Sequence, residues 1–152
     1  MEFDPNNPVV KLCAQGMDLE GLGQPEEASK LFLQAWDDAI SDFEKFTAAH
    51  YVARHQKSVA DKLKWDETAL QLAQKINTDA IKVSFPSLYL NIAKCYEDLN
   101  DYNTAMRNYQ LAVSFTCWLP DNGYGKMVIS AILNGTERVS KYYGPGDNKT
   151  NH

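Results

Sequence analysis

The chain has 152 residues, of which 44% are hydrophobic and 23% are charged, a composition typical of a folded globular protein with its own core. Its formal net charge is −5, with 15 basic and 20 acidic residues, which argues against a general nucleic-acid-binding protein because such proteins carry a basic excess. No stretch reaches the roughly 20 apolar residues of a membrane-spanning helix, and residues 1–5 lack the basic and apolar regions of a signal peptide. We therefore expect a cytoplasmic protein with no nucleic-acid and no membrane partner. Three cysteines without paired spacing fit reduced thiols, namely Cys13, Cys95 and Cys117.

Helical periodicity runs along most of the chain, after a lead-in at residues 1–7. No segment shows the alternation of a β-strand. Residues 144–152 have no apolar periodicity, which predicts a disordered tail. We expect helices at about 8–20, 25–40, 42–57, 66–80, 86–100, 102–116 and 124–141.

Start and stop signals place the boundaries between these helices. Pro25 and Pro86 stand at first helical positions, where the missing N–H costs nothing. Ser41 and Glu44 have the spacing of a capping box, in which each side chain bonds the backbone amide of the other residue. Residues 57–64 are predicted to be a long connection between two helices.

The segment 25–40 carries one apolar face, and parts of it recur in the chain. Its small and large residues alternate as Ala-x-x-x-aromatic-x-x-Ala, and residues 100–112 repeat that pattern with the same entry turn. Residues 65–76 are a degenerate copy. Repetition on this scale is typical of stacked helix arrays. The apolar face comprises Ala28, Leu31, Phe32, Ala35, Ala39 and Ile40.

On these residues the chain resembles a tetratricopeptide repeat (TPR) protein, a small bacterial-type array with a lengthened second repeat. Each repeat of that family has about 34 residues, a helix A followed by a helix B. In two repeats the small residue of helix A, Gly16 or Ala93, lies twelve positions before the first alanine of helix B, Ala28 or Ala105. In the second repeat the corresponding residues are sixteen apart, Ala53 and Ala69.

The resemblance implies an all-α, right-handed αα superhelix. Three TPR helix pairs and a C-terminal capping helix would form a single domain, residues 8–143. The repeats would span about 8–41, 42–82 and 86–118, with the capping helix at about 124–141. We also expect Ala28, Ala69 and Ala105 to be buried at helix crossings.

The resemblance further implies a non-catalytic module that binds an extended segment of a partner protein in a concave groove lined by the A helices. Arg54 and Lys94 occupy the same position in successive A helices, and such cations favour an acidic segment. His50 would strengthen its binding by charging near pH 6.5. Alternatively, the two cations only form internal ion pairs with Glu97, Asp98 or Glu44. The predicted groove residues are His50, Tyr51, Arg54, Asn91 and Lys94.

The sequence shows no catalytic constellation. His50 and His55 are five residues apart, which places them on different sides of a helix and disfavours a metal site. We therefore expect no cofactor, no metal and no enzymatic activity, and an enzyme or nucleic-acid factor is a distant third interpretation. The second is a self-associating structural protein, with a homodimer formed through an apolar C-terminal region. That region comprises Trp118, Leu119, Tyr124, Met127, Tyr142 and Tyr143.

Overall fold

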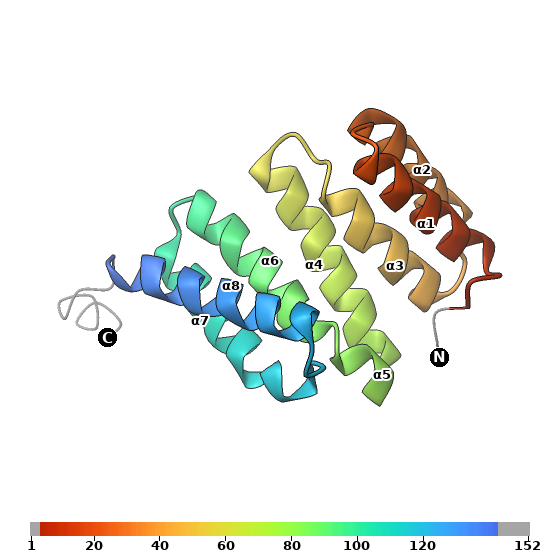
Figure 1. Cartoon of the computed structure of the whole chain (residues 1–152). Coiled ribbons are helices and arrows are strands. Elements are labelled where there is room, and N and C mark those ends of the chain that lie inside the picture. Colours follow the sequence, from red (N-terminus) through yellow and green to blue (C-terminus); the bar gives the residue numbers. More distant parts are fainter. Residues whose placement is uncertain (1–3, 143–152) are drawn as a thin grey trace. The chain divides into compact units, whose positions relative to one another are not determined.

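The computed structural model describes residues 4–142, and all regular structure in that range is helical (Figure 1). This confirms the all-α class. The chain forms two compact units, unit 1 at Met1–Ile81 and unit 2 at Lys82–His152. The predicted tail at 144–152 lies outside the described residues. The helices are α1 (Pro8–Gly21), α2 (Pro25–Asp38), α3 (Asp42–Ala53), α4 (Val59–Ile76), α5 (Asp79–Lys82), α6 (Phe85–Asp98), α7 (Tyr102–Ser114) and α8 (Gly123–Ser140), with a 3₁₀ turn, η1, at Thr116–Trp118.

Unit 1 consists of two helix pairs. Helices α1 and α2 form the first pair, α3 packs against both of them, and α4 packs against α3. Phe32 of α2 is fully buried at the centre, and its ring occupies the space that Gly16 of α1 leaves free. A side chain as small as alanine at position 16 would put its Cβ 2.3 Å from that ring. The core of these first three helices comprises Val9, Cys13, Ala28, Phe32, Ala35, Ala48 and Val52.

The helix boundaries of unit 1 follow the sequence signals in most places. Asn7 caps α1 through its side chain, and Ser41 and Glu44 form the predicted capping box at the start of α3. The long connection predicted at 57–64 is wrong, because α4 begins at Val59. Its N-terminus is fixed by Ser58, whose hydroxyl accepts a hydrogen bond from the Asp61 amide at 3.0 Å.

The repeat pattern predicts most of the buried positions correctly. Ala28, Ala69 and Ala105 are all completely buried, as expected. Ile40 is an exception, with 85% of its surface exposed. Helix α2 ends at Asp38 and the chain becomes extended at Ala39, so the helical spacing no longer applies at residue 40.

Unit 2 repeats the arrangement of the first three helices of unit 1. Helices α6 and α7 form a pair, and α8 packs against both, as α3 does against α1 and α2. Tyr109 of α7 is fully buried and contacts α8 at Gly135, where a Cβ atom would come within 2.3 Å of the ring. The core cluster of this unit contains Ala93, Ala105, Met106, Tyr109 and Val139.

Candidate functional site

Two carboxylates hold equivalent positions in the two units. We call the first helix of each pair A-type and the second B-type. Glu20 on α1 and Glu97 on α6 each lie four residues after the small residue of an A-type helix, Gly16 or Ala93. Each pairs with an arginine from the next A-type helix of its unit. The Nε atom of Arg54, the C-cap residue of α3, lies 3.5 Å from Glu20 Oε2, and Arg138 Nε of α8 lies 3.2 Å from Glu97 Oε2.

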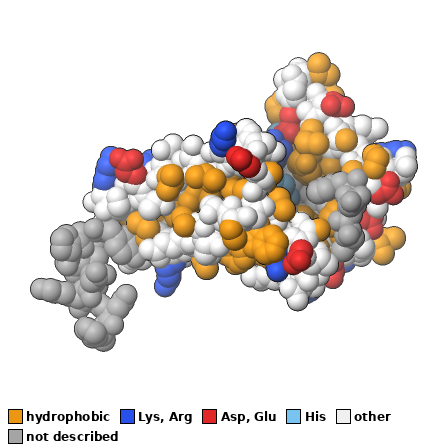
Figure 2. All heavy atoms as spheres, turned by 60° about the horizontal axis from the view of Figure 1, so that its bottom comes forward, with side chains coloured by type: hydrophobic (Ala, Val, Ile, Leu, Met, Phe, Trp, Pro, Cys, Tyr) orange, Lys and Arg blue, Asp and Glu red, His pale blue; other side chains and the backbone are white. Residues whose placement is uncertain are grey.

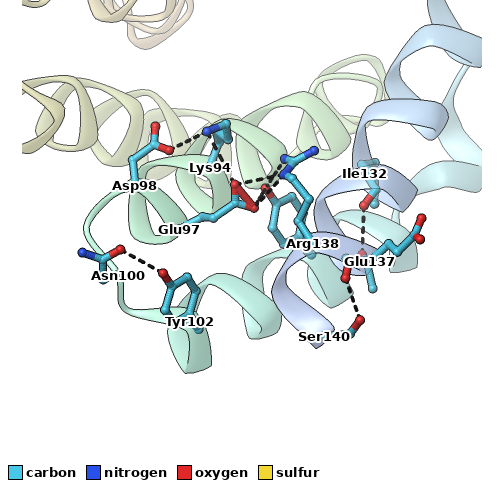
Figure 3. Close-up of polar contacts among 11 residues, drawn as sticks. Lys94, Glu97, Asp98, Asn100, Tyr102, Ile132, Glu137, Arg138 and Ser140 are labelled. Carbon is cyan, nitrogen blue, oxygen red and sulfur yellow. Dashed lines mark hydrogen bonds and ion pairs between the residues drawn. The ribbon is translucent and has the colours of Figure 1, made fainter. Parts of the chain in front are cut away.

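The cluster around Glu97 connects three helices of unit 2 (Figure 3). Only 11% of the Glu97 side chain is exposed, and Arg138 donates through Nε to both of its oxygens. The Tyr109 hydroxyl also donates to Glu97 Oε1, at 3.3 Å. Burial, followed by the charge of Glu97, raises the pKa of Tyr109 to about 12, so the phenol keeps its proton at neutral pH. The hydrogen bond to Glu97 raises the pKa of Arg138.

Lys94 lies at the edge of this cluster and is half exposed. Its Nζ lies 2.5 Å from Asp98 Oδ1 and 3.5 Å from Glu97 Oε2. The hydrogen bond to Asp98 raises the pKa of Lys94. An exposed i,i+4 pair of this kind contributes about 0.3–0.5 kcal/mol to stability. Lys94 can therefore exchange Asp98 for another carboxylate at little cost.

A cavity of about 410 Å³ opens beside these groups within unit 2. At its side the rings of Tyr102 and Tyr142 stack in parallel with their centroids 3.9 Å apart. Arg138 and Lys141 contribute positive charge to the cavity wall. Its lining residues are Glu97, Asp98, Asn100, Tyr102, Arg138, Lys141 and Tyr142.

The corresponding cluster in unit 1 uses aromatic stacking as well as charge. Glu20 Oε2 lies 2.8 Å from His55 Nε2 and 3.5 Å from Arg54 Nε. The Phe32 ring stacks on both Tyr51 and His55, with centroids 5.1 and 5.6 Å away. The Arg54 guanidinium lies 5.5 Å from the centre of the Tyr51 ring, in cation–π contact. Arg54 is thus held in place while nearly half of its side chain, 48%, remains exposed.

His50 differs from the expectation. Its Nδ1 is inaccessible to solvent and has no hydrogen-bond partner among the described residues. Burial, followed by the nearby charges of Arg54 and Lys62, lowers the pKa of His50 to about 4. The expectation that His50 becomes charged near pH 6.5 is therefore wrong, because in the folded protein it is neutral there.

The predicted groove residues fall into two groups in different units. His50 and Tyr51 lie on α3 of unit 1 and Arg54 is its C-cap residue, whereas Asn91 and Lys94 lie on α6 of unit 2. Lys94 does pair with Glu97 and Asp98, as the internal-pair alternative expected. Arg54 pairs with Glu20, while the Glu44 side chain accepts from the Ser41 amide in the capping box.

The sequence interpretation named Glu97 only as an internal partner of the cations, and it assigned no role to Glu20 or Arg138. A signal for the acids was present, because Glu20 and Glu97 hold the same position of two repeats. Arg138 could not be assigned in this way, since it contacts Glu97 from 41 residues along the chain.

The described part of the chain, residues 4–142, contains no group of three or more His, Cys, Asp or Glu side chains that could hold a metal ion. Within the same range no helix combines the length and apolarity needed to cross a membrane.

Comparison with known proteins finds one family model that matches part of the chain. The tetratricopeptide repeat model matches residues 86–116, which cover most of α6, all of α7 and the turn between them. No curated protein and no solved structure matches the chain. A tetratricopeptide repeat indicates a protein–protein interaction module, and such repeats are typically non-catalytic. The match at residues 86–116, together with the adjacent helix pairs of an all-helical chain, supports a tetratricopeptide-repeat-type protein.

Proposed function

We propose that this protein is a non-catalytic adaptor that binds an extended, acidic segment of a partner protein along its A-type helices. The cations concerned lie at the end of α3 in unit 1, and on α6 and α8 in unit 2. One observation carries the proposal. In unit 2, Lys94, Arg138 and Lys141 gather at and beside an open cavity, and together they outnumber the two carboxylates, Glu97 and Asp98, with which they share it.

The guanidinium of Arg138 is already oriented for binding a ligand carboxylate. A guanidinium has five N–H donors, and Arg138 directs Nε to Glu97 and Nη2 to the Tyr109 hydroxyl. The side chain is 48% exposed, so its remaining donors are open to a ligand. Because Glu97 and Tyr109 already fix the guanidinium, ligand binding would cost little additional side-chain entropy.

Lys94 supplies a second charge by exchanging its partner. The Lys94–Asp98 pair is exposed and weak, whereas Glu97 is largely buried and stays bound to Arg138. A ligand carboxylate would replace Asp98 on Lys94, and Asn91 on the same helix would bond the backbone of the ligand. In unit 1, Arg54 would act in the same way beside Tyr51, whereas His50 stays neutral.

The first experiment identifies the partner. The wild-type protein and a Lys94→Glu variant serve as parallel baits in extracts of the source cell, and captured proteins are compared by mass spectrometry. We expect a partner that binds wild type and is depleted on the variant. An Arg107→Glu bait is the matched control, because Arg107 is an exposed cation on α7, the B-type helix of the same repeat, and among residues 4–142 its side chain bonds only to Thr104. Partners retained equally by all three baits would contradict the proposal.

A further inference from the structure

Helix α8 occupies in unit 2 the place that α3 occupies in unit 1. Both pack against a preceding helix pair. Both carry an arginine, Arg54 or Arg138, that pairs with the equivalent carboxylate of that pair. Three residues before each arginine, Tyr51 and Gly135 meet the central ring of the B-type helix. Position by position, α8 is therefore the first helix of a further repeat.

In unit 1 the second helix of the repeat, α4, packs against α3, but no described helix covers α8 in this way. The missing cover changes the solvent exposure of equivalent positions on α3 and α8. Ala49, five residues before Arg54, is completely buried. Leu133, five residues before Arg138, has 59% of its surface exposed. Helix α8 thus presents a face that lacks its second helix.

This uncovered face of α8 is a stripe with an apolar centre and a charge at each end. Figure 2 shows hydrophobic side chains gathered on the side of unit 2 formed by α7 and α8. On α8 itself Ile129 and Leu133 are both exposed, with the small Ser130 between them at helical spacing. Lys126 precedes them and Glu137 follows them, at helical spacing and both exposed.

The two charges at the ends have no ion-pair partner among the described residues of unit 2. Neither Lys126 nor Glu137 forms an ion pair with any residue in the range 4–142. They cannot pair with each other, since eleven residues of helix separate them by about 16 Å. A surface with a cation at one end and an anion at the other is complementary to itself when it is turned end for end.

We propose that the face of α8 from Lys126 to Glu137 binds the same face of a second copy, with the two helices antiparallel. A two-fold axis midway between Ser130 and Leu133 places Lys126 of each copy opposite Glu137 of the other. It also sets Leu133 of each copy against Ser130 of the other, where the small side chain allows a close approach. Such an interface is isologous and closes on itself, so it yields a dimer and not a filament.

The size of the face determines how strong this dimer is. Helix α8 has 18 residues, which corresponds to a length of about 27 Å. One helix face per copy buries less than the roughly 800 Å² per partner of a standard stable interface. The dimer is therefore reversible and depends on protein concentration. It weakens at high salt, because its ion pairs lie at an exposed rim.

Variants that exchange the charges at positions 126 and 137 test the antiparallel register directly. Their dimerisation is measured by sedimentation equilibrium over a range of protein concentrations. In Lys126→Glu or in Glu137→Lys, both ion pairs of the dimer become like-charge contacts, and we expect a dissociation constant raised about tenfold. In the double variant, K126E with E137K, the pairs are restored with reversed sign. We therefore expect the double variant to dimerise like wild type.

The variants are expected to fold, because both side chains are exposed and the exchange puts the acid nearer the N-terminus and the base nearer the C-terminus of α8. Lys11→Glu, at an exposed lysine on α1, controls for the change in net charge and should dimerise normally. Three results would overturn the proposal: a wild-type protein that is monomeric at every concentration, single variants that dimerise like wild type, or a double variant as weak as the single ones. A monomeric wild type would leave the face to a helix of another protein or to residues 143–152.

Discussion

Arg138 and Glu97 lie 41 residues apart in the sequence, yet Arg138 Nε is 3.2 Å from both carboxylate oxygens of Glu97. The pair joins the last helix of unit 2 to the first. Because Glu97 is only 11% exposed, its charge depends on protein donors and not on water. The contact therefore combines two roles, since it fastens α8 to the repeat and holds a half-exposed guanidinium in a fixed position.

Replacing Glu97 with glutamine removes the charge while keeping the shape of the side chain. Arg138 and Lys94 lose the negative charge of their common partner, and only one of its two acceptor oxygens remains. We expect the free energy of unfolding to fall by about 1.5–2 kcal/mol, the lower part of the range for hydrogen bonds to charged groups. Urea denaturation followed by circular dichroism measures this change. Asp98→Asn is the matched control at the exposed carboxylate and should cost less than about 0.5 kcal/mol. Equal costs for the two variants would contradict a structural role for Glu97.

Gly135→Ala tests the close contact between α7 and α8. The new Cβ would lie 2.3 Å from atoms of the Tyr109 ring, which is fully buried. We expect a loss of about 1–3 kcal/mol in stability from overpacking, although alanine itself favours a helix over glycine by about 1 kcal/mol. The control is Gly21→Ala, where no atom lies within 4 Å of the added Cβ. Thermal denaturation should show the control unchanged or slightly stabilised, and a similar result for Gly135→Ala would refute the contact.

His50 should make the folded protein sensitive to mild acid. Its folded-state pKa of about 4 lies below the ordinary value of 6.5, so between these two pH values the unfolded chain binds more protons than the folded chain. Stability from this residue is complete above about pH 6.5 and is lost as the pH falls towards 4. A pKa difference of this size corresponds to about 3 kcal/mol at most.

The measurement compares wild type with His50→Leu in urea at pH 7.5 and at pH 5. Carboxylates also titrate at the lower pH, but they do so in both proteins, and the difference between the proteins isolates His50. We expect wild type to lose more stability than the variant on acidification. An identical loss in the two proteins would show that His50 is not held neutral by the fold.

Local spacing explains how much of the fold could be predicted from the sequence. The small and aromatic residues around Phe32 and Tyr109 recur at fixed distances, and each proved to be the centre of a helix pair. The start of α4 was missed because its first turns, from Val59, precede the segment 65–76 in which the repeat pattern was recognised. There the only signal was the cap formed by Ser58 and Asp61.

The candidate site was less accessible to prediction because it depends on tertiary contacts. Arg54 and Lys94 were recognisable from their repeat position, and both are half-exposed cations on A-type helices. The partners that fix the charges come from other helices, as Arg138 does for Glu97. The loss of charge on His50 likewise follows from burial, which no local pattern around residue 50 reveals.

The central claim, that half-exposed cations on the A-type helices bind an acidic partner segment, is tested most directly by isothermal titration calorimetry with the partner found by affinity capture. The double variant Arg54→Glu with Lys94→Glu is compared with Lys30→Glu with Arg107→Glu, which makes the same change in net charge on B-type helices. Binding to wild type should weaken as salt rises towards and beyond 0.1 M, where exposed charges more than about 10 Å apart are screened. The account predicts that the first double variant loses binding while the second keeps it. A first double variant that is folded and binds as tightly as wild type would contradict the account.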